Sequence, residues 1–166
     1  DGSADIVINS HHQTETGVVS RIIARAEIVM VFASEKSPGK AHYVDPTQLS
    51  DIDFVYYQGL NQQSSDQIVD LAQIDFKSFT VLDSMDTILE LVASGYGVTA
   101  VPMFVIEQSS LRKQLICKSI NQNKSYKTWR AHYLKKPAST TIDTFVNLLT
   151  TREAACQPLK SESLPT

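Results

Sequence analysis

The sequence predicts an α/β protein with mainly parallel sheets, and three observations support this fold class. Segments with the apolar pattern of strands alternate with segments that have the apolar spacing of helices, an order typical of parallel sheets covered by helices. Residues 28–33 form a continuous apolar run, which is typical of a strand buried on both faces. Apolar residues make up 42% of the 166 residues and charged residues 20%, as in ordinary globular domains.

The predicted strands are short apolar or alternating runs. They cover residues 4–8, 28–33, 54–57, 76–82, 98–101 and 127–135. In the 76–82 and 127–135 segments apolar and polar residues alternate, which is the period of a strand with one buried face. In the 127–135 strand, Trp129 is expected to lie in the core.

The predicted helices begin at residues that favour helix N-termini. Asp45 followed by Pro46 is typical of an N-cap with proline in the first turn, so a short helical turn is expected through Leu49. Longer helices are expected after Asp66 and over residues 84–94, 103–110 and 140–151, the last with apolar residues along one face. Residues 152–166 are polar, contain two prolines and are expected to be a poorly ordered tail.

The tripeptide Gly95-Tyr96-Gly97 does not have the sequence context of a nucleotide site. A dinucleotide-binding loop follows a strand and opens a helix, because the phosphate binds at the helix N-terminus. Here the predicted helix comes first and the predicted strand last. Gly95 is therefore expected to end the helix in a left-handed conformation, and Gly97 is expected to allow a sharp turn into the strand.

Composition and motifs exclude several classes of function. The net charge of −3 argues against a nucleic-acid surface on this segment, and no apolar run is long enough to span a membrane. The first residues do not resemble a signal peptide. A Gly-x-Ser-x-Gly elbow and a P-loop are both absent, so no catalytic residue and no cofactor is predicted.

Three motifs, in this order along the chain, carry a family resemblance. They are Gly2-x-Ala4-Asp5-Ile6-x-Ile8, Asp45-Pro46-x-x-Leu49 and Leu91-Val92-Ala93-x-Gly95-x-Gly97-Val98-x-x-Val101-Pro102. Together they resemble the effector-binding domain of LysR-type transcriptional regulators over about residues 2–150. The third motif is the most specific of the three.

The resemblance implies a two-lobed fold similar to that of periplasmic binding proteins. The implied first lobe comprises residues 1–33 and 134–151, and the second lobe residues 34–133. In that family the first lobe has a further strand and helix ahead of the position of Asp1, so the first lobe is expected to be incomplete here. The DNA-binding helix-turn-helix that precedes the domain in the family is expected to lie outside this segment as well.

The resemblance also implies a function. A small-molecule effector binds between the lobes and modulates DNA binding by the absent N-terminal domain. The intact protein is expected to be a cytoplasmic homo-oligomer without membrane contact, and the domain is not expected to be an enzyme.

The expected effector-binding residues follow strands or start helices at the carboxyl edges of the sheets, where small ligands bind in open α/β sheets, and the resemblance implies that Asn9 and Ser10 face the cleft. They are Asn9, Ser10, Gln58, Gly59, Ser84, Met85 and Pro102. Short polar side chains at such positions can bond a carboxylate or hydroxyl of a ligand, and a helix N-terminus favours an anion. Most also have a purely structural alternative: Ser84 can serve only as an N-cap, Gln58-Gly59 can be a plain turn, Asn9-Ser10 can belong to a solvated loop, and Pro102 can simply start the next helix.

Other functions remain open from the sequence. A periplasmic solute-binding receptor has the same architecture, and an enzyme on this frame would show turnover that depends on Ser84 or Asp86. His11, His12 and Glu15 include metal-ligand types, but no metal site is predicted without a further fixed ligand.

Overall fold

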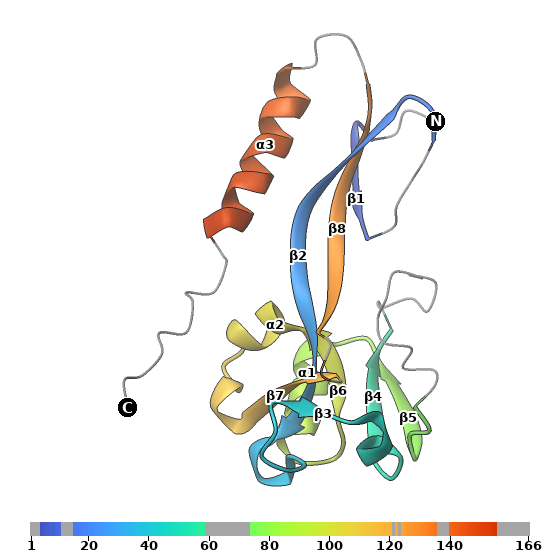
Figure 1. The fold of residues 1–166 in the computed structure, drawn as a ribbon, viewed down its shortest axis with the longest axis vertical. Coiled ribbons are helices and arrows are strands. Elements are labelled where there is room, and N and C mark those ends of the chain that lie inside the picture. The colour runs from blue at the N-terminus through green and yellow to red at the C-terminus, as the bar shows by residue number, and fades with distance from the viewer. Residues whose placement is uncertain are drawn as a thin grey trace. The chain divides into compact units, whose positions relative to one another are not determined.

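The computed structural model (Figure 1) describes residues 4–10, 15–58, 74–120, 122, 124–135 and 140–155, and for residue 140 and residues 151–155 it describes the backbone alone. The chain divides into two compact units. The first unit comprises Asp1–Arg25 and Thr128–Thr166, and the second unit Ala26–Lys127. The expected helix after Asp66 lies outside the described residues.

The elements alternate along the chain as α/β proteins do. The strands are β1 (Ile6–Asn9), β2 (Val18–Ala33), β3 (Tyr43–Val44), β4 (Asp53–Tyr57), β5 (Ser78–Leu82), β6 (Thr99–Pro102), β7 (Leu115–Ile120) and β8 (Ser125–Leu134). The helices are α1 (Met85–Ala93), α2 (Met103–Glu107) and α3 (Thr140–Ala155), with short 3-10 helices at Ser34–Lys36, Pro46–Leu49 and Arg112–Gln114.

In the second unit the sheet is mainly parallel, as predicted. β4 and β5 are parallel, and a parallel bridge between Phe54 and Val98 links β4 to the start of β6. β6 and β7 both pair antiparallel with β2, and β3 pairs parallel with β7. It follows that β3, β4, β5, β6 and β7 run in one direction and β2 runs in the other.

The first unit departs from the parallel prediction, because its described pairing of β1 with β8 is antiparallel. β8 joins β1 from a distant part of the chain, and a long connection allows either direction, so no local sequence pattern indicated the antiparallel pairing. β2 also starts at Val18 rather than at the predicted residue 28. The prediction missed this start because residues 18–27 mix polar and apolar side chains and lack a continuous apolar run. β2 and β8 contribute residues to both units, and the lobe boundaries at residues 33 and 134 stay a prediction.

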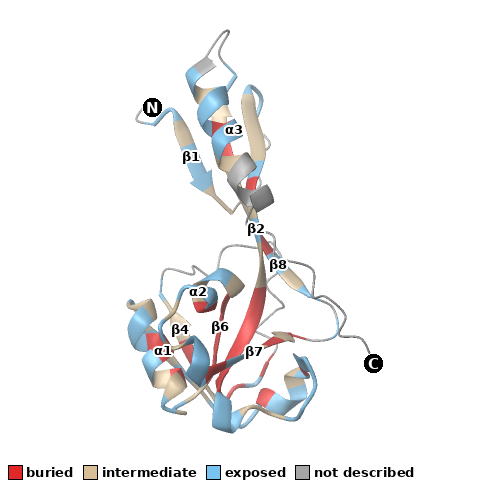
Figure 2. Ribbon diagram, turned by 90° about the vertical axis from the view of Figure 1, so that its left-hand side faces the viewer, coloured by how far each residue is buried: buried red, intermediate tan, exposed pale blue. Residues whose placement is uncertain are grey.

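The second unit has a core on each side of its sheet. Figure 2 shows the buried end of β2 in red. Met30 and Phe32 pack into one cluster, with Phe54 and Leu49, while Val29 and Val31 pack into the other. The second cluster includes Ile88, Leu89 and Val92 of α1. The end of β2 is thus buried on both faces, as its apolar run predicted.

The two glycines after α1 have different roles. Gly95 has φ of 81°, and the amides of Gly95 and Tyr96 donate to the carbonyls of Val92 and Leu91 at 2.9 and 3.1 Å. These two bonds form a Schellman motif, so Gly95 ends the helix as predicted. Gly97 does not have a positive φ; instead, a Cβ there would lie 2.3 Å from the carbonyl oxygen of Asp53. Gly97 therefore permits β4 to approach closely, a requirement that the sequence did not indicate.

Among the described residues, the first unit has a smaller core. Its buried cluster is Ile23, Ala131 and Val146, and half-buried Trp129 packs against it. The packing of Trp129 agrees with its expected core position. α3 supplies Val146 to this cluster and continues to Ala155, beyond the predicted end at residue 151.

Candidate effector-binding site

The predicted residues of the second unit lie at one edge of its sheet. Gln58, Ser84 and Pro102 stand at or just beyond the ends of β4, β5 and β6, which run in the same direction. The amide of Gln58 donates to the carbonyl of Leu82 at 2.8 Å, so the ends of β4 and β5 are joined directly. The fold thus brings these positions to the carboxyl edge of the sheet, while Gly59 lies outside the described residues.

Ser84 is the N-cap of α1, and its hydroxyl is partly occupied by that role. Its Oγ accepts hydrogen bonds from the amide of Thr87 at 3.3 Å and from the Oγ1 hydroxyl of Thr87 at 3.0 Å. A serine hydroxyl has two acceptor lone pairs and one donor hydrogen. Both lone pairs accept from Thr87, and no residue in the described part of the chain accepts the hydroxyl hydrogen.

Met85 and Pro102 provide packing surface. Met85 is half-buried against the core cluster that includes α1. Pro102 is buried, lies opposite Ile28 in the β2–β6 pairing and precedes α2 as its N-cap residue. These two side chains therefore fix the shape of the sheet edge more than they offer polar contacts.

In the first unit, Asn9 contacts a histidine that the sequence interpretation overlooked. The Asn9 Oδ1 atom lies 3.1 Å from Nε2 of His132, whose side chain is 3% exposed. Asn9 also lies opposite Arg130 in the β1–β8 register, and Ser10 follows it as a half-buried bend. The sequence feature that could have indicated His132 is the alternation of residues 127–135, because it places Arg130 and His132 on one face of the strand and Trp129 on the other.

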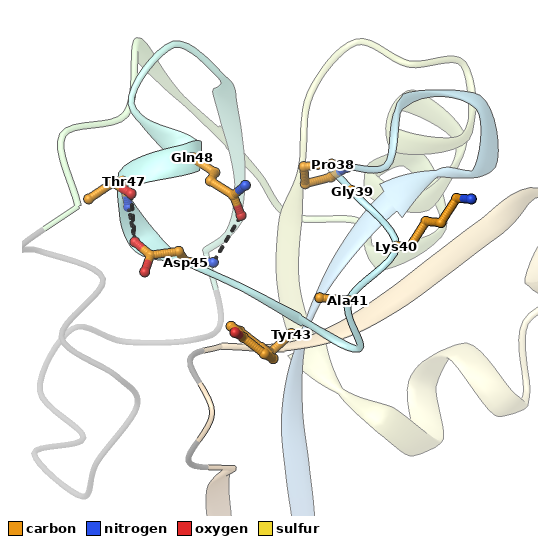
Figure 3. A pocket seen from close by; sticks show the side chains of 8 residues that line it. All are labelled: Pro38, Gly39, Lys40, Ala41, Tyr43, Asp45, Thr47 and Gln48. Carbon is orange, nitrogen blue, oxygen red and sulfur yellow. Dashed lines mark hydrogen bonds between the residues drawn. The ribbon is translucent and has the colours of Figure 1, made fainter.

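A separate hollow of about 360 Å³ lies in the second unit (Figure 3). It is lined by Pro38, Gly39, Lys40, Ala41, Tyr43, Asp45, Thr47 and Gln48. Asp45 forms the predicted helix cap here, since its carboxylate accepts from Thr47 and its amide donates to Gln48 at 3.2 Å. The bonds from Thr47 lower the pKa of Asp45. None of the predicted effector-binding residues lines this hollow.

The loop beside the hollow is held by a buried lysine. The Lys118 ammonium, on a side chain that is 4% exposed, donates to the carbonyl oxygens of Pro38 and Gly39. A buried ammonium requires such acceptors, because burial of an unpaired charge is costly. Lys118 therefore has a structural role in shaping the loop.

Reactive groups are scarce among the described residues. Burial raises the pKa of the Cys117 thiol to about 11, so this cysteine is protonated at neutral pH and is a weak nucleophile. Over the described ranges, no group of three His, Cys, Asp or Glu side chains could hold a metal ion. His11 and His12 lie outside those ranges. No described helix is long and apolar enough to cross a membrane.

Solved structures of similar fold are regulatory domains. The regulatory domain of MetR, a LysR family regulator from N. meningitidis, is 16% identical with a TM-score of 0.77, over 93% of this chain and 73% of that one. The reduced OxyR regulatory domain from Pseudomonas aeruginosa is 15% identical with a TM-score of 0.71, over 90% and 74%. The Synechocystis CcmR regulatory domain in complex with 2-PG is 19% identical with a TM-score of 0.68, over 91% and 74%. These likenesses show the two-lobed fold.

The sequence itself carries the family assignment. No curated protein matches it at a significant level. The LysR substrate binding domain family matches residues 1–154, which is nearly the whole chain. The chain belongs to the LysR substrate binding domain family.

Proposed function

We propose that this chain senses a small-molecule effector for a LysR-type transcription regulator. The observation that carries the proposal is the family match over residues 1–154. The CcmR domain, which was solved in complex with 2-PG, is an example of a small molecule bound to a domain of this fold. The same family match favours a regulator over a periplasmic solute receptor.

The proposed effector contacts are the sequence-predicted residues. In the first unit they are Asn9 and Ser10, and in the second unit Gln58, Gly59, Ser84, Met85 and Pro102. The remaining donor hydrogen of Ser84, at the start of α1, supports a contact to an acceptor oxygen of the ligand. Effector binding would then favour one of two arrangements of the units, and the difference in binding free energy would be transmitted to attached DNA-binding helices.

The wider setting of this domain is also part of the proposal. The domain would act in the cytoplasm, in a homo-oligomer that binds DNA through a separate N-terminal domain. No catalytic step is assigned to it, because effector binding alone performs this role.

The proposal is tested by binding measurements on the 166-residue chain. A metabolite library is screened by thermal shift, and each hit is measured by isothermal titration calorimetry. We expect Ser84→Ala and Ser10→Ala each to weaken binding of a hit by about tenfold, the usual effect of one lost hydrogen bond to a charged group. Ser110→Ala, at an exposed position outside the predicted site, is the matched control.

Three outcomes would contradict parts of this proposal. Unchanged affinity in both variants would remove the site assignment. The absence of any saturable hit would remove effector sensing by this chain. Turnover of a hit, lost in Ser84→Ala or Asp86→Ala, would indicate an enzyme instead.

A further inference from the structure

The β1–β8 pair of the first unit has one face that packs against α3 and one face on which polar side chains lie with Val7. Side chains directly opposite each other in an antiparallel pair share a face, and alternate residues along a strand share it too. Ile6 lies opposite Tyr133, and both pack with Ala131 against the cluster that includes Val146 of α3. The apolar face is therefore the one that contacts α3.

The other face carries a group of three polar side chains, Asn9, Arg130 and His132. Asn9 lies directly opposite Arg130, and His132 lies opposite Val7, one position further along the same face. All three belong to the first unit, so their arrangement depends on the β1–β8 register alone. Asn9 is distant in sequence from Arg130 and His132, and the strand pairing brings it to them.

His132 fixes the orientation of the Asn9 side chain. Its Nε2 is 3.1 Å from Asn9 Oδ1, and its ring is held in place by burial. An amide oxygen accepts hydrogen bonds, so the histidine donates from Nε2. The Asn9 carboxamide then has its oxygen toward His132 and its two N–H donors directed elsewhere.

We propose that Asn9 and Arg130 form a carboxylate-binding subsite in the first unit, with His132 as the residue that positions Asn9. This inference rests on the proposed effector-sensing function and names the chemical group that the effector carries. An amide NH₂ and a guanidinium present donors only, and a guanidinium fits a carboxylate with two parallel bonds. The sequence interpretation included Asn9 but neither Arg130 nor His132.

The test uses the ¹⁵N-labelled 166-residue chain with acetate as the probe. Acetate and its neutral analogue acetamide are titrated separately, with sodium chloride used to hold the ionic strength constant. We expect acetate, and not acetamide, to shift the side-chain signals of Asn9 and Arg130 to saturation. Arg130→Gln should weaken acetate binding by about tenfold, while Arg112→Gln, an exposed arginine of the second unit, should change it less than about twofold.

The positioning role has its own readouts. In the wild-type chain, the ring ¹⁵N shifts should place the His132 proton on Nε2. His132→Gln, which keeps a donor, should retain acetate affinity within about threefold, whereas His132→Phe should lose about tenfold. A proton on Nδ1 alone, or full affinity in His132→Phe, would overturn the role of His132. The wild-type spectrum gives this answer even where the phenylalanine variant does not fold.

The subsite and the proposed function fail in different ways. Equal shifts with acetamide, no saturable shift with acetate, or unchanged acetate affinity in Arg130→Gln would overturn the subsite. A neutral metabolite that binds the chain without shifting Asn9 or Arg130 would also overturn it, but would leave effector sensing intact. Saturable acetate binding at Arg130, with no metabolite hit in the library screen, would support the subsite and contradict the proposed function.

Discussion

The two units differ in how many buried apolar side chains lie next to their proposed effector-binding residues. In the second unit both faces of the sheet are buried, and Ser84 and Met85 open a helix that contributes three buried side chains, Ile88, Leu89 and Val92. In the first unit, Asn9 ends a strand whose residues are all half-buried or exposed, and the buried cluster among the described residues is Ile23, Ala131 and Val146. We infer that the second unit provides rigid contacts and that the first unit opens more readily, since local stability follows buried apolar contact.

The largest expected effect is from truncation in the two-sided core. Phe54→Ala removes a ring that is 2% exposed and that contacts Phe76 at a centroid distance of 4.5 Å. We expect a loss of about 3–5 kcal/mol in the free energy of unfolding, measured by urea denaturation followed by circular dichroism. Phe79→Ala, on the neighbouring strand and 58% exposed, is the control and should cost about 1 kcal/mol. Equal losses would contradict the assigned core.

Glycine substitutions compare the two units directly. In the second unit, Gly97→Ala would push a methyl group into the Asp53 backbone and disturb the bonds by which Val98 holds β4, and should cost about 2–3 kcal/mol. In the first unit, Gly17→Ala meets nothing within 4 Å and should cost about 1–2 kcal/mol for its φ of 86°. Both losses are measured as unfolding free energy by thermal or urea denaturation. A smaller loss for Gly97→Ala than for Gly17→Ala would show that β4 can move away from the added methyl group with little loss of stability.

The contrast between these glycines shows what the sequence could predict. Gly95 was predicted correctly because a helix C-cap is a local pattern, readable from the apolar spacing before it. The requirement at Gly97 comes from Asp53, a residue distant in sequence, so only the strand arrangement reveals it. The same limit applies to Asn9 and His132, whose contact depends on the β1–β8 register.

Strands were predicted best where their apolar pattern was strong. The buried end of β2 and most of β4 followed from continuous apolar runs, and β6 followed from a short run in which Thr99 is the one polar residue. β7 was not predicted because its sequence, LICKSI, places the buried Lys118 within the strand, and a lysine there normally indicates exposure. The carbonyls that bind this ammonium, from Pro38 and Gly39, are distant in sequence and give no local signal.

The small core of the first unit gives a third prediction. Val146→Ala removes two methyl groups from a fully buried position in α3 and should cost about 2 kcal/mol. Because the two units have separate cores, we expect hydrogen exchange to speed up in α3 and β1 while protection in α1 and β6 is kept. Thr144→Ala, elsewhere on the same helix, is the control. Equal loss of protection in both units would show that they unfold together.

The N-cap of α1 gives a smaller effect that separates stability from binding. Ser84→Ala removes the acceptor for Thr87 and should cost about 1 kcal/mol of unfolding free energy. Ser84→Asp also caps a helix and should retain most of that stability, but it lacks a hydroxyl hydrogen and adds a negative charge. An effector hit with a carboxylate should therefore bind Ser84→Asp more weakly than wild type. Full affinity in a stable Ser84→Asp variant would make Ser84 only a cap.

The smallest effect concerns the exposed end of the β4–β5 pair and depends on pH. The Ser78 hydroxyl donates to Asp53 Oδ1 at 2.6 Å, and this bond is the main cause that lowers the pKa of Asp53, with Lys77 contributing. A carboxyl group whose pKa is lower in the folded than in the unfolded state stabilises the fold at any pH above its unfolded pKa. This stabilisation is lost as the pH falls through the folded pKa. Wild type should therefore exceed Ser78→Ala in stability above about pH 4, and the difference should shrink at lower pH. Carboxyl ¹³C titration of Asp53 checks the cause, because the Asp53 pKa should rise in Ser78→Ala. An unchanged Asp53 pKa would assign the lowering to Lys77, and the Asp53 pKa would then rise in Lys77→Gln instead.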